Sequence, residues 1–162
     1  MEIEYCVNCI DKAEMMKNLI MKGTSGAPKA VVNQCSAMYM NIDGFKQRMA
    51  ADYERVYTAW IGDICIGVVS VINSQSPDES KKLCSILFIY VDEDYRNIGV
   101  ASKLIQKCLE DCKNNSVFKL SFNARFSEKR MICLVINHGF RPEGYINMGS
   151  KEFDSIVFEI MP

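Results

Sequence analysis

Two apolar patterns with different periods follow each other in the middle of the chain. Leu87–Val91 is a continuous run of aliphatic, β-branched and aromatic residues, which is typical of a strand buried on both faces. The short, largely acidic stretch Asp92–Tyr95 follows and predicts a turn. Apolar residues then recur at helical spacing; they are Ala101, Leu104, Ile105, Cys108, Leu109 and Cys112. The pattern predicts a strand, a tight turn and a helix in direct succession.

The N-terminal part of the chain predicts one strand and two helices. Ile3–Cys9 has the composition of a strand, and Asp11 is placed to cap the helix that follows it. Lys22–Pro28 contains two glycines and a proline, so we expect the helix to end there and an irregular loop to begin. Asn41 or Asp43 is placed to cap the second helix, which is expected to run through Phe45, Met49 and Ala50.

The next two apolar runs predict a hairpin. Arg55–Ile61 and Ile64–Ile72 are separated only by Gly62-Asp63, a two-residue connection that favours a tight antiparallel turn. Polar residues dominate from 73 to 82 and predict an exposed loop before the next strand.

The C-terminal part predicts a strand, a helix and a final pair of strands. Val117–Phe122 is the expected fifth strand, and Ser127 is placed to cap the next helix. Gly139 is expected at the end of that helix in the left-handed conformation. Tyr145–Met148 and Ser155–Ile160 complete the pattern. This order predicts a mixed α+β fold with a largely antiparallel sheet of about seven strands flanked by helices.

Length and composition indicate one ordinary globular domain spanning residues 1–162. The chain is 49% hydrophobic and 24% charged, with a formal net charge of −1, so we expect no attraction to nucleic acid or to anionic membranes. No apolar run is long enough to cross a bilayer. The N-terminus lacks the basic and apolar regions of a signal peptide, and we therefore expect a cytoplasmic location.

The eight cysteines are expected to be reduced thiols that pack as small apolar side chains. Cys6-x-x-Cys9 raises the question of a metal or redox site. The chain has no second pair at this spacing, and His138 is its single histidine. Residues three apart on a strand also point to opposite faces. We therefore predict no metal site.

The start of the central helix has the features of a phosphate site. Its first N–H groups lack helical partners, and the helix dipole places about half a positive charge there. Gly99 and Ala101 are small, so an anion can approach the backbone closely. Short glycine motifs also occur by chance. By spacing alone, an ordinary strand-to-helix connection remains an alternative.

The residues of this connection match a known family. Arg96-x-x-Gly99-x-Ala101 resembles the Arg/Gln-x-x-Gly-x-Gly/Ala loop of the GNAT N-acetyltransferase superfamily. Val91 ends a strand five residues before the arginine, as in that family, and Asn137–Phe140 resembles the family's helix–Gly–Phe ending. The resemblance covers nearly the whole chain in element order. It implies the acetyltransferase fold, in which the fourth and fifth strands splay apart around the pantetheine arm of the cofactor.

Membership of this family implies acetyl-CoA as the acyl donor. The backbone groups of Ile89 and Val91 are then the candidates for pairing with the pantetheine amides. The candidates around the pyrophosphate are Arg96, Asn97, Ile98, Gly99, Val100, Ala101 and Ser102. For Arg96 the alternative is a solvated surface arginine, and we favour a structural or phosphate-adjacent role.

The sequence departs from the family at the general acid and the general base. Many members have a tyrosine four residues before the glycine of the Gly-Phe ending; here Val135 stands there and cannot donate a proton. Some members have a glutamate on the fourth strand, where this chain has Ser85. Tyr145, Glu143 and His138 are candidate substitutes. None is assigned, and the catalytic residues stay unknown.

The leading hypothesis is an acetyl-CoA-dependent N-acetyltransferase in which a primary amine attacks directly within a ternary complex. Cys84 and Cys133 suggest a covalent route, but a catalytic cysteine needs a base, and His138 is the only histidine. The acceptor is expected to be a small molecule or a peptide, recognised by Lys22–Asn41, the second helix and the last two strands. The alternative is a non-catalytic acyl-CoA-binding regulatory module of the same fold. A homodimer is compatible with the sequence.

Overall fold

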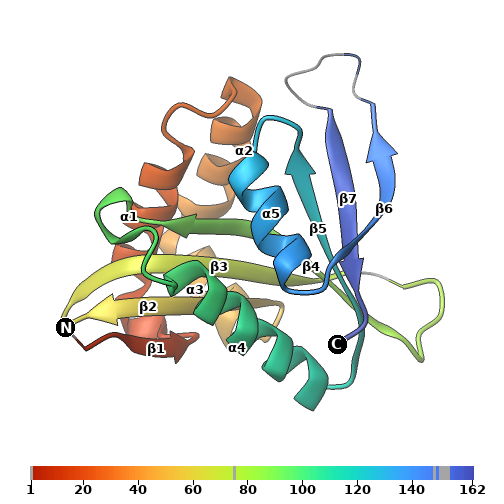
Figure 1. Cartoon of the computed structure of the whole chain (residues 1–162). Coiled ribbons are helices and arrows are strands. Elements are labelled where there is room, and N and C mark those ends of the chain that lie inside the picture. The colour runs from red at the N-terminus through yellow and green to blue at the C-terminus, as the bar shows by residue number, and fades with distance from the viewer. Residues whose placement is uncertain (1, 75, 148, 150–153) are drawn as a thin grey trace. The chain divides into compact units, whose positions relative to one another are not determined.

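The computed structural model describes residues 2–74, 76–147, 149 and 154–162 (Figure 1). Within these residues, seven strands form one sheet in the order β1-β2-β3-β4-β5-β7-β6. The strands are β1 (Glu4–Val7), β2 (Glu54–Ile61), β3 (Ile64–Ser74), β4 (Lys82–Val91), β5 (Val117–Arg125), β6 (Arg141–Ile146) and β7 (Ser155–Ile160). The helices are α1 (Ala13–Thr24), α2 (Lys29–Tyr39), α3 (Ile42–Ala50), α4 (Val100–Asn114) and α5 (Lys129–Asn137), with 3-10 turns η1 (Ile10–Lys12) and η2 (Glu93–Tyr95).

The sheet is largely antiparallel, with one parallel pair. β1 pairs antiparallel with β2, and β7 pairs antiparallel with both β5 and β6. β4 and β5 are parallel from Lys82↔Val117 to Ile86↔Phe122. Gly62, at φ +56°, begins the two-residue connection of the β2–β3 hairpin. The predicted mixed α+β fold is confirmed.

The chain folds into two compact parts. The first comprises Met1–Val71 and Phe88–Leu104, and the second comprises Ile72–Leu87 and Ile105–Pro162. Both β4 and α4 continue from one part into the other. The expectation of a single domain over residues 1–162 stays a prediction.

The core of the first compact part lies between its helices and β2–β3. The buried residues there include Ala13, Met16, Leu19, Ile20, Phe45, Met49, Val56, Trp60 and Val68. They come from α1, α3 and the inner strands, at the helical and strand periods that the sequence shows. Met15 of α1 is 41% exposed, whereas its neighbour Met16 and the first residue of the helix, Ala13, are buried.

The buried carboxylate of Glu54 links α2 and α3 to the sheet through hydrogen bonds in this part. Glu54 on β2 is fully buried and accepts hydrogen bonds from the Tyr39 hydroxyl (2.9 Å), the Ser70 hydroxyl (2.6 Å) and Arg48 Nε (2.8 Å). Tyr39 ends α2, and Arg48 lies on α3. Burial, followed by the nearby Glu54 carboxylate, raises the pKa of Tyr39. The charge is therefore buried with its partners in place.

The second compact part is built on β5, β7 and β6 together with α5. Its buried side chains include Leu120, Phe122, Val135, Phe140 and Phe158. Gly139 has φ +88°, and the Phe140 N–H donates to the Val135 carbonyl oxygen at 3.1 Å. The predicted left-handed glycine at the end of α5 is confirmed.

Among the described residues, α2 is the one α-helix that the sequence did not predict. It occupies Lys29–Tyr39, within the segment predicted as a loop after Lys22. Pro28 precedes it with φ −52° and ψ 143°, which suits the residue before a helix. Its apolar residues Val31, Cys35 and Met38 follow helical spacing, a signal that the two glycines and the proline obscured.

Two predicted helix caps are wrong, and one is confirmed. Asp11 lies inside η1, so α1 begins at Ala13 without a side-chain cap. Glu128, rather than Ser127, precedes α5, and its side chain accepts the backbone N–H of Arg125 at 2.9 Å. Asn41 does cap α3, since its side-chain oxygen accepts the N–H of Gly44 at 3.0 Å.

Strand boundaries differ from the predictions at both starts and ends. β4 begins at Lys82, five residues before the continuous apolar run, because its first half contains the polar residues Lys82 and Ser85 among apolar ones. β6 spans Arg141–Ile146 rather than Tyr145–Met148; Met148 lies outside the described residues. β7 has the predicted bounds, Ser155–Ile160.

The expectation of reduced thiols is wrong for one pair, because Cys6 and Cys9 form a disulfide. β1 ends at Val7, and Asn8 follows with φ +50°. The chain therefore turns between the two cysteines, and the alternation of strand side chains no longer separates them. Asn8 is held in this turn by its own side chain, which accepts the Val56 N–H at 2.7 Å.

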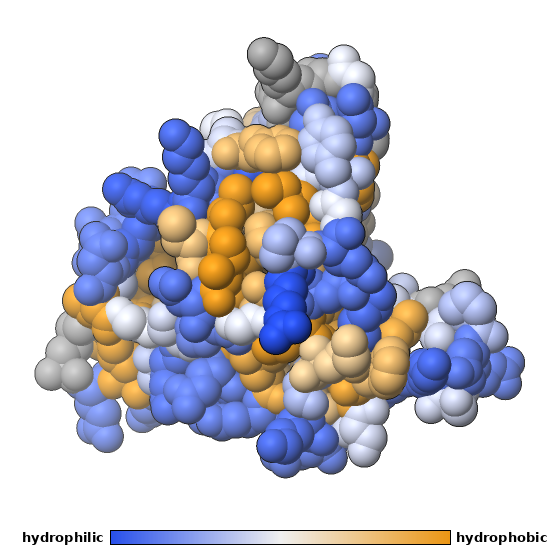
Figure 2. Space-filling model, turned by 45° about the vertical axis from the view of Figure 1, so that its right-hand side comes forward, coloured by the Kyte–Doolittle hydropathy of each residue, from blue (hydrophilic) through white to orange (hydrophobic). Residues whose placement is uncertain are grey.

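Apolar and polar residues share the surface, as the orange and blue areas of Figure 2 show. The exposed large apolar residues include Ile64, Ile98, Ile136 and Met161. In the described part of the chain, no helix combines the length and apolarity that a membrane span requires. Among the same residues, no group of three His, Cys, Asp or Glu side chains is arranged to hold a metal ion.

Candidate acyl-donor site

The predicted donor residues lie in the first compact part, where β4 ends. Ile89 and Val91 are buried, as the apolar run predicts, and Phe88 and Tyr90 alternate with them and are half-buried. The rings of Phe88 and Tyr90 lie 6.3 Å apart between centroids. They face the last turn of α1: a Cβ added to Gly23 would lie 2.5 Å from Tyr90 Cγ.

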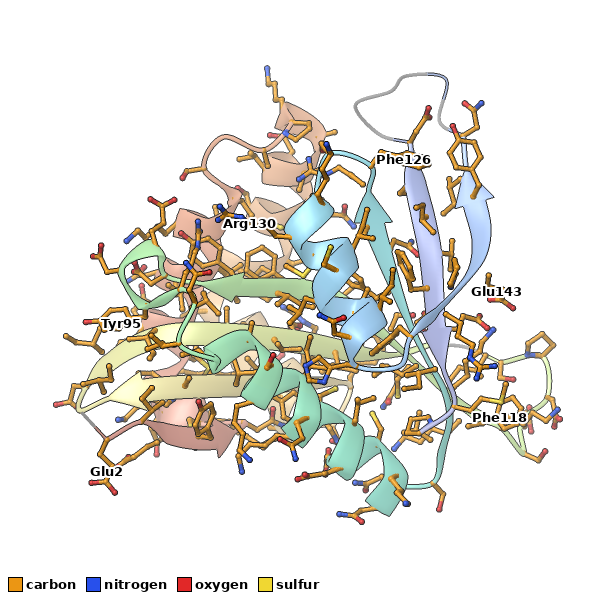
Figure 3. All side chains as sticks on the ribbon, in the orientation of Figure 1. Glu2, Tyr95, Phe118, Phe126, Arg130 and Glu143 are labelled. Carbon is orange, nitrogen blue, oxygen red and sulfur yellow. A yellow bond between two sulfur atoms is a disulfide. The ribbon has the colours of Figure 1, made fainter. Side chains whose placement is uncertain are left out.

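Asp92 organises the turn after β4. Its N–H donates to the Ile66 carbonyl oxygen at 2.9 Å, and its own carbonyl oxygen accepts the Tyr95 N–H at 2.9 Å. One carboxylate oxygen accepts the Asp94 N–H at 3.4 Å, and the other lies 2.8 Å from Lys22 Nζ. The hydrogen bond from Lys22 lowers the pKa of Asp92. Tyr95, labelled in Figure 3, ends this turn.

Arg96 anchors the loop to the strand. Its Nε donates to the Val91 carbonyl oxygen at 3.0 Å, and its guanidinium carbon lies 5.4 Å from the Tyr90 ring centroid. Its Nη2 lies 3.6 Å from a carboxylate oxygen of Glu93. The side chain is still 37% exposed. These contacts give Arg96 the structural role favoured by the sequence, while a contact to phosphate stays a prediction.

Asn97 and Gly99 turn the chain into α4. Their φ angles are +63° and +88°, in the left-handed region that asparagine tolerates and glycine adopts freely. A Cβ at Gly99 would meet nothing within 4 Å, so backbone conformation rather than space favours glycine. The Gly99 carbonyl oxygen accepts the Lys103 N–H at 3.0 Å. The N–H groups of residues 100–102 therefore form the open end of the helix.

The first turn of α4 packs closely against β3. Val100 and Leu104 are buried, and a Cβ added to Gly67 would lie 2.8 Å from Val100 Cγ1 and 3.0 Å from Leu104 Cδ1. In contrast, Ile98 and Ser102 are exposed. The residues predicted around the pyrophosphate are therefore of two kinds. Val100 is buried and packs the helix against β3, whereas Ile98 and Ser102 are exposed around the open end of the helix.

Chemically, this arrangement suits an anion. Three N–H groups and the positive end of a 15-residue helix meet at a surface loop. The sequence pattern identifies the residues of the loop itself. It does not show that the loop is supported by contacts between segments distant in sequence, which involve Gly67, Lys22, Gly23 and Asp92. The one signal in the sequence was glycine inside a predicted element, namely Gly23 at the end of a helix and Gly67 within a strand, because such a glycine can indicate close approach of another segment.

The position expected for a strand-four base carries no basic group. The Ser85 hydroxyl oxygen lies 2.8 Å from that of Ser74 and 2.8 Å from that of Ser121. Ser121 also donates to the Cys84 carbonyl oxygen at 3.4 Å. Hydroxyls exchange hydrogen bonds but are not ionised near neutral pH, so this chain of serines lacks a conventional base.

Val135, at the family's tyrosine position in the second compact part, is fully buried. The three candidate substitutes for that tyrosine as proton donor differ in their surroundings. The Tyr145 hydroxyl donates to an Asp154 carboxylate oxygen at 2.9 Å, and this hydrogen bond raises the pKa of Tyr145. Glu143, labelled on β6 in Figure 3, has a pKa raised mainly by a hydrogen bond with Glu159. Burial lowers the pKa of His138. Tyr145 is thus a weaker acid than a free tyrosine.

The two cysteines considered for covalent catalysis are also located. Cys84 is buried on β4, and its thiol donates to the Asn73 side-chain oxygen at 3.4 Å. Cys133 is exposed on α5. Burial of Cys84 beside a neutral amide does not favour a thiolate.

Solved structures with the same fold cover the chain almost completely. The PaiA N-acetyltransferase from Thermoplasma acidophilum, in complex with coenzyme A, has a TM-score of 0.79 and 11% identity over 100% of both chains. The ribosomal-protein-alanine N-acetyltransferase from Brucella melitensis has a TM-score of 0.77 and 14% identity over 100% of both chains. A chain of the NatC complex bound to Gag peptide and CoA has a TM-score of 0.78 and 17% identity, over 100% of this chain and 99% of that one.

The sequence comparison adds the family to this likeness of fold. No curated protein sequence matches the chain. The profile of the acetyltransferase (GNAT) family matches residues 26–140, a span that contains Arg96, Gly99 and the Gly139-Phe140 ending. The resemblance inferred from these residues is confirmed, and acetyl-CoA is the acyl donor that this family membership supports. The chain belongs to the acetyltransferase (GNAT) family.

Proposed function

We propose that the protein transfers an acetyl group from acetyl-CoA to a primary amine by direct attack within a ternary complex. The observation that carries this proposal is the strand–turn–helix of Val91–Ser102. Two left-handed residues, Asn97 and Gly99, expose the first N–H groups of α4, and Arg96 fixes the loop to Val91. In this proposal the helix start binds the pyrophosphate of the donor.

Direct attack is preferred to an acetyl-cysteine intermediate because of the surroundings of Cys84 and His138. The Cys84 thiol is buried and bonded to an amide oxygen, and burial lowers the pKa of His138. In the direct reaction the amine nitrogen forms the new C–N bond as the C–S bond breaks. The amine proton goes to solvent, and the departing thiolate is protonated by water, since thiols are fair leaving groups.

The acceptor is proposed to be a small-molecule amine or a peptide N-terminus or lysine. Relatives of the same fold include enzymes named for a ribosomal-protein alanine and a complex bound to a peptide. The segment 22–41, proposed to contact the acceptor, contains two lysines and no acidic residue. This charge does not favour a polycationic acceptor.

The first experiment is calorimetric titration of the purified protein with acetyl-CoA, followed by a thiol-release assay over a panel of amines and peptides. We expect saturable binding and CoA release with one class of amine. Gly99→Glu, which adds a carboxylate at the proposed pyrophosphate site, should not bind acetyl-CoA. Gly62→Glu is its control, because Gly62 also has a positive φ angle but lies in the β2–β3 turn.

Each outcome separates the proposal from its rival. Binding with CoA release confirms an acetyltransferase and names its acceptor class. Binding without release across the panel favours the non-catalytic acyl-CoA-binding module, for which the aliphatic Val135 and the serine at position 85 are the supporting features. Absence of binding would overturn the role of Arg96–Ala101.

A further inference from the structure

The last turn of α1 contacts the end of β4, although the two lie about 70 residues apart in sequence. Lys22 Nζ lies 2.8 Å from an Asp92 carboxylate oxygen. At the next position, a Cβ added to Gly23 would lie 2.5 Å from Tyr90 Cγ and 2.8 Å from Phe88 Cζ. Two adjacent residues of α1 thus make an ion pair and a close packing contact with the same strand end.

The packing contact leaves no room for a side chain. Gly23 is the last-but-one residue of α1 and does not have a positive φ angle, so its backbone conformation does not by itself require glycine. A methyl group there would overlap aromatic ring atoms of Tyr90 and Phe88, which β4 holds in place. The absence of a side chain therefore lets α1 approach the strand closely.

Both contacted residues lead into Arg96–Ser102, which we call the donor loop because these residues are the proposed binding site for the pyrophosphate of the acyl donor. Asp92, besides binding Lys22, accepts the Asp94 N–H and bonds through its backbone to Tyr95. Tyr90 lies under the guanidinium of Arg96 at 5.4 Å, and Arg96 Nε holds the Val91 carbonyl oxygen. From α1, one path of contacts leads through the carboxylate and another through the aromatic ring to the same loop.

We infer that the last turn of α1 is a positioning element for the acyl donor. Lys22 acts through Asp92, and Gly23 acts through Tyr90, to hold Asn97–Ser102 in the conformation that presents the N–H groups of α4. Both are positioning residues, because each acts through another residue. The inference rests on the proposed function, since it concerns how tightly the same loop binds coenzyme A.

The ion pair is tested by coenzyme A affinity in a set of charge variants. Lys22 is 53% exposed, and pairs of this kind contribute modestly, so Lys22→Met should raise the Kd of coenzyme A about three- to fivefold. Asp92→Asn should have a similar effect, and combining the two should add little. Lys17→Met is the matched control, because Lys17 pairs with Glu14 within α1 itself; its Kd should equal that of the wild type.

Exchanging the charges separates positioning from direct contact with phosphate. In Lys22→Asp the two carboxylates repel, and adding Asp92→Lys restores an attractive pair. Recovery of affinity in the double variant supports positioning through Asp92. If the double variant binds as poorly as Lys22→Asp alone, Lys22 contacts the phosphate itself, and the inference is overturned.

A ligand-free measurement keeps this test distinct from the proposed function. Hydrogen exchange of the Tyr95 and Lys103 amides, which donate to the Asp92 and Gly99 carbonyl oxygens, should be faster in Lys22→Met than in Lys17→Met or the wild type, with the later turns of α4 unchanged. Unchanged exchange of these two amides would overturn the inference even if coenzyme A binds. If the wild type fails to bind coenzyme A while the exchange effect is present, the proposed function fails and the structural coupling stands.

Steady-state kinetics supply a readout that general destabilisation would not produce. Lys22→Met should raise the KM for acetyl-CoA by the same factor as the Kd, with kcat changed less than about twofold. Gly23→Ala should raise that KM further, because the added methyl group overlaps the Tyr90 ring and has no torsion of its own that could move it away. A lower kcat with an unchanged KM would contradict positioning of the donor.

Discussion

Two single residues determine how the donor loop turns into α4. Asn97 and Gly99 both have positive φ, which costs little for glycine and is tolerated by asparagine. Any other side chain at Gly99 is strained, even though the space around it is open. Gly99 thus acts through its backbone conformation, which leaves the N–H groups of the next three residues open at the start of α4.

Gly99→Glu is expected to abolish coenzyme A binding. It adds backbone strain at φ +88° and places a carboxylate beside the N–H groups that are proposed to bind the pyrophosphate. Calorimetric titration should show at least a roughly hundredfold weaker Kd, equivalent to about 2.7 kcal/mol. Gly62→Glu carries the same charge and a similar strain at φ +56° and should bind normally. Normal affinity in Gly99→Glu would show that the loop is misassigned.

Val135 is a position where this chain differs from the residue that is common in its family. The family often has a tyrosine there, whereas the valine of this chain is fully buried on α5. Val135→Tyr should therefore destabilise the protein by about 1–3 kcal/mol through overpacking. Denaturant unfolding provides the measurement. Ile136→Tyr, on the same helix but 49% exposed, should change stability by less than about 0.5 kcal/mol. An undiminished stability for Val135→Tyr would reveal room beside this helix.

At the scale of elements, close contact between α4 and β3 sets the position of the donor loop. Gly67 allows Val100 and Leu104 to lie directly on the strand. The sequence predicted both elements well, since α4 begins one residue after Gly99 and its stripe residues Leu104, Ile105, Cys108 and Cys112 are buried. The period of apolar residues determines which face is buried, but not which glycine the helix crosses.

Gly67→Ala is expected to move the start of α4 away from β3. Its Cβ would lie 2.8 Å from Val100 Cγ1, and a valine has no long side chain that can rotate away. The expected cost is about 1–3 kcal/mol of stability together with weaker coenzyme A binding. Gly144→Ala on β6 is the control, since a Cβ there meets nothing within 4 Å. Equal affinity and stability for both variants would contradict the tight α4–β3 contact.

At the scale of the whole molecule, the two compact parts raise the question of cooperativity. Trp60 is the single tryptophan and lies in the first part, so its fluorescence reports that part alone, while far-ultraviolet circular dichroism reports both. If residues 1–162 form one domain, the two signals should show coincident unfolding transitions. Saturation with acetyl-CoA at about 100 times its Kd should raise the midpoint of both by roughly 5–10 °C. Separate midpoints for the two signals would argue for two domains.

The sequence by itself determined the fold class, most of the elements and the position of the strand–turn–helix that contains the donor loop. These follow from local physics: apolar periods distinguish strands from helices, and a glycine followed by a helix start presents unpaired N–H groups. Strand boundaries were predicted less well where polar residues interrupt the apolar run, as Lys82 and Ser85 do in the first half of β4. Helix α2 was hidden because its start follows two glycines and Pro28.

The tertiary structure alone decided features that local patterns do not show. The Cys6–Cys9 disulfide depends on the turn at Asn8, and the burial of Val135 depends on what covers α5. The Lys22–Asp92 ion pair joins residues about 70 positions apart. A sequence pattern records the burial and conformation of each segment, whereas such contacts depend on how segments pack, and no local period encodes that. For this protein, sequence determines where the donor loop is, and packing determines what holds it.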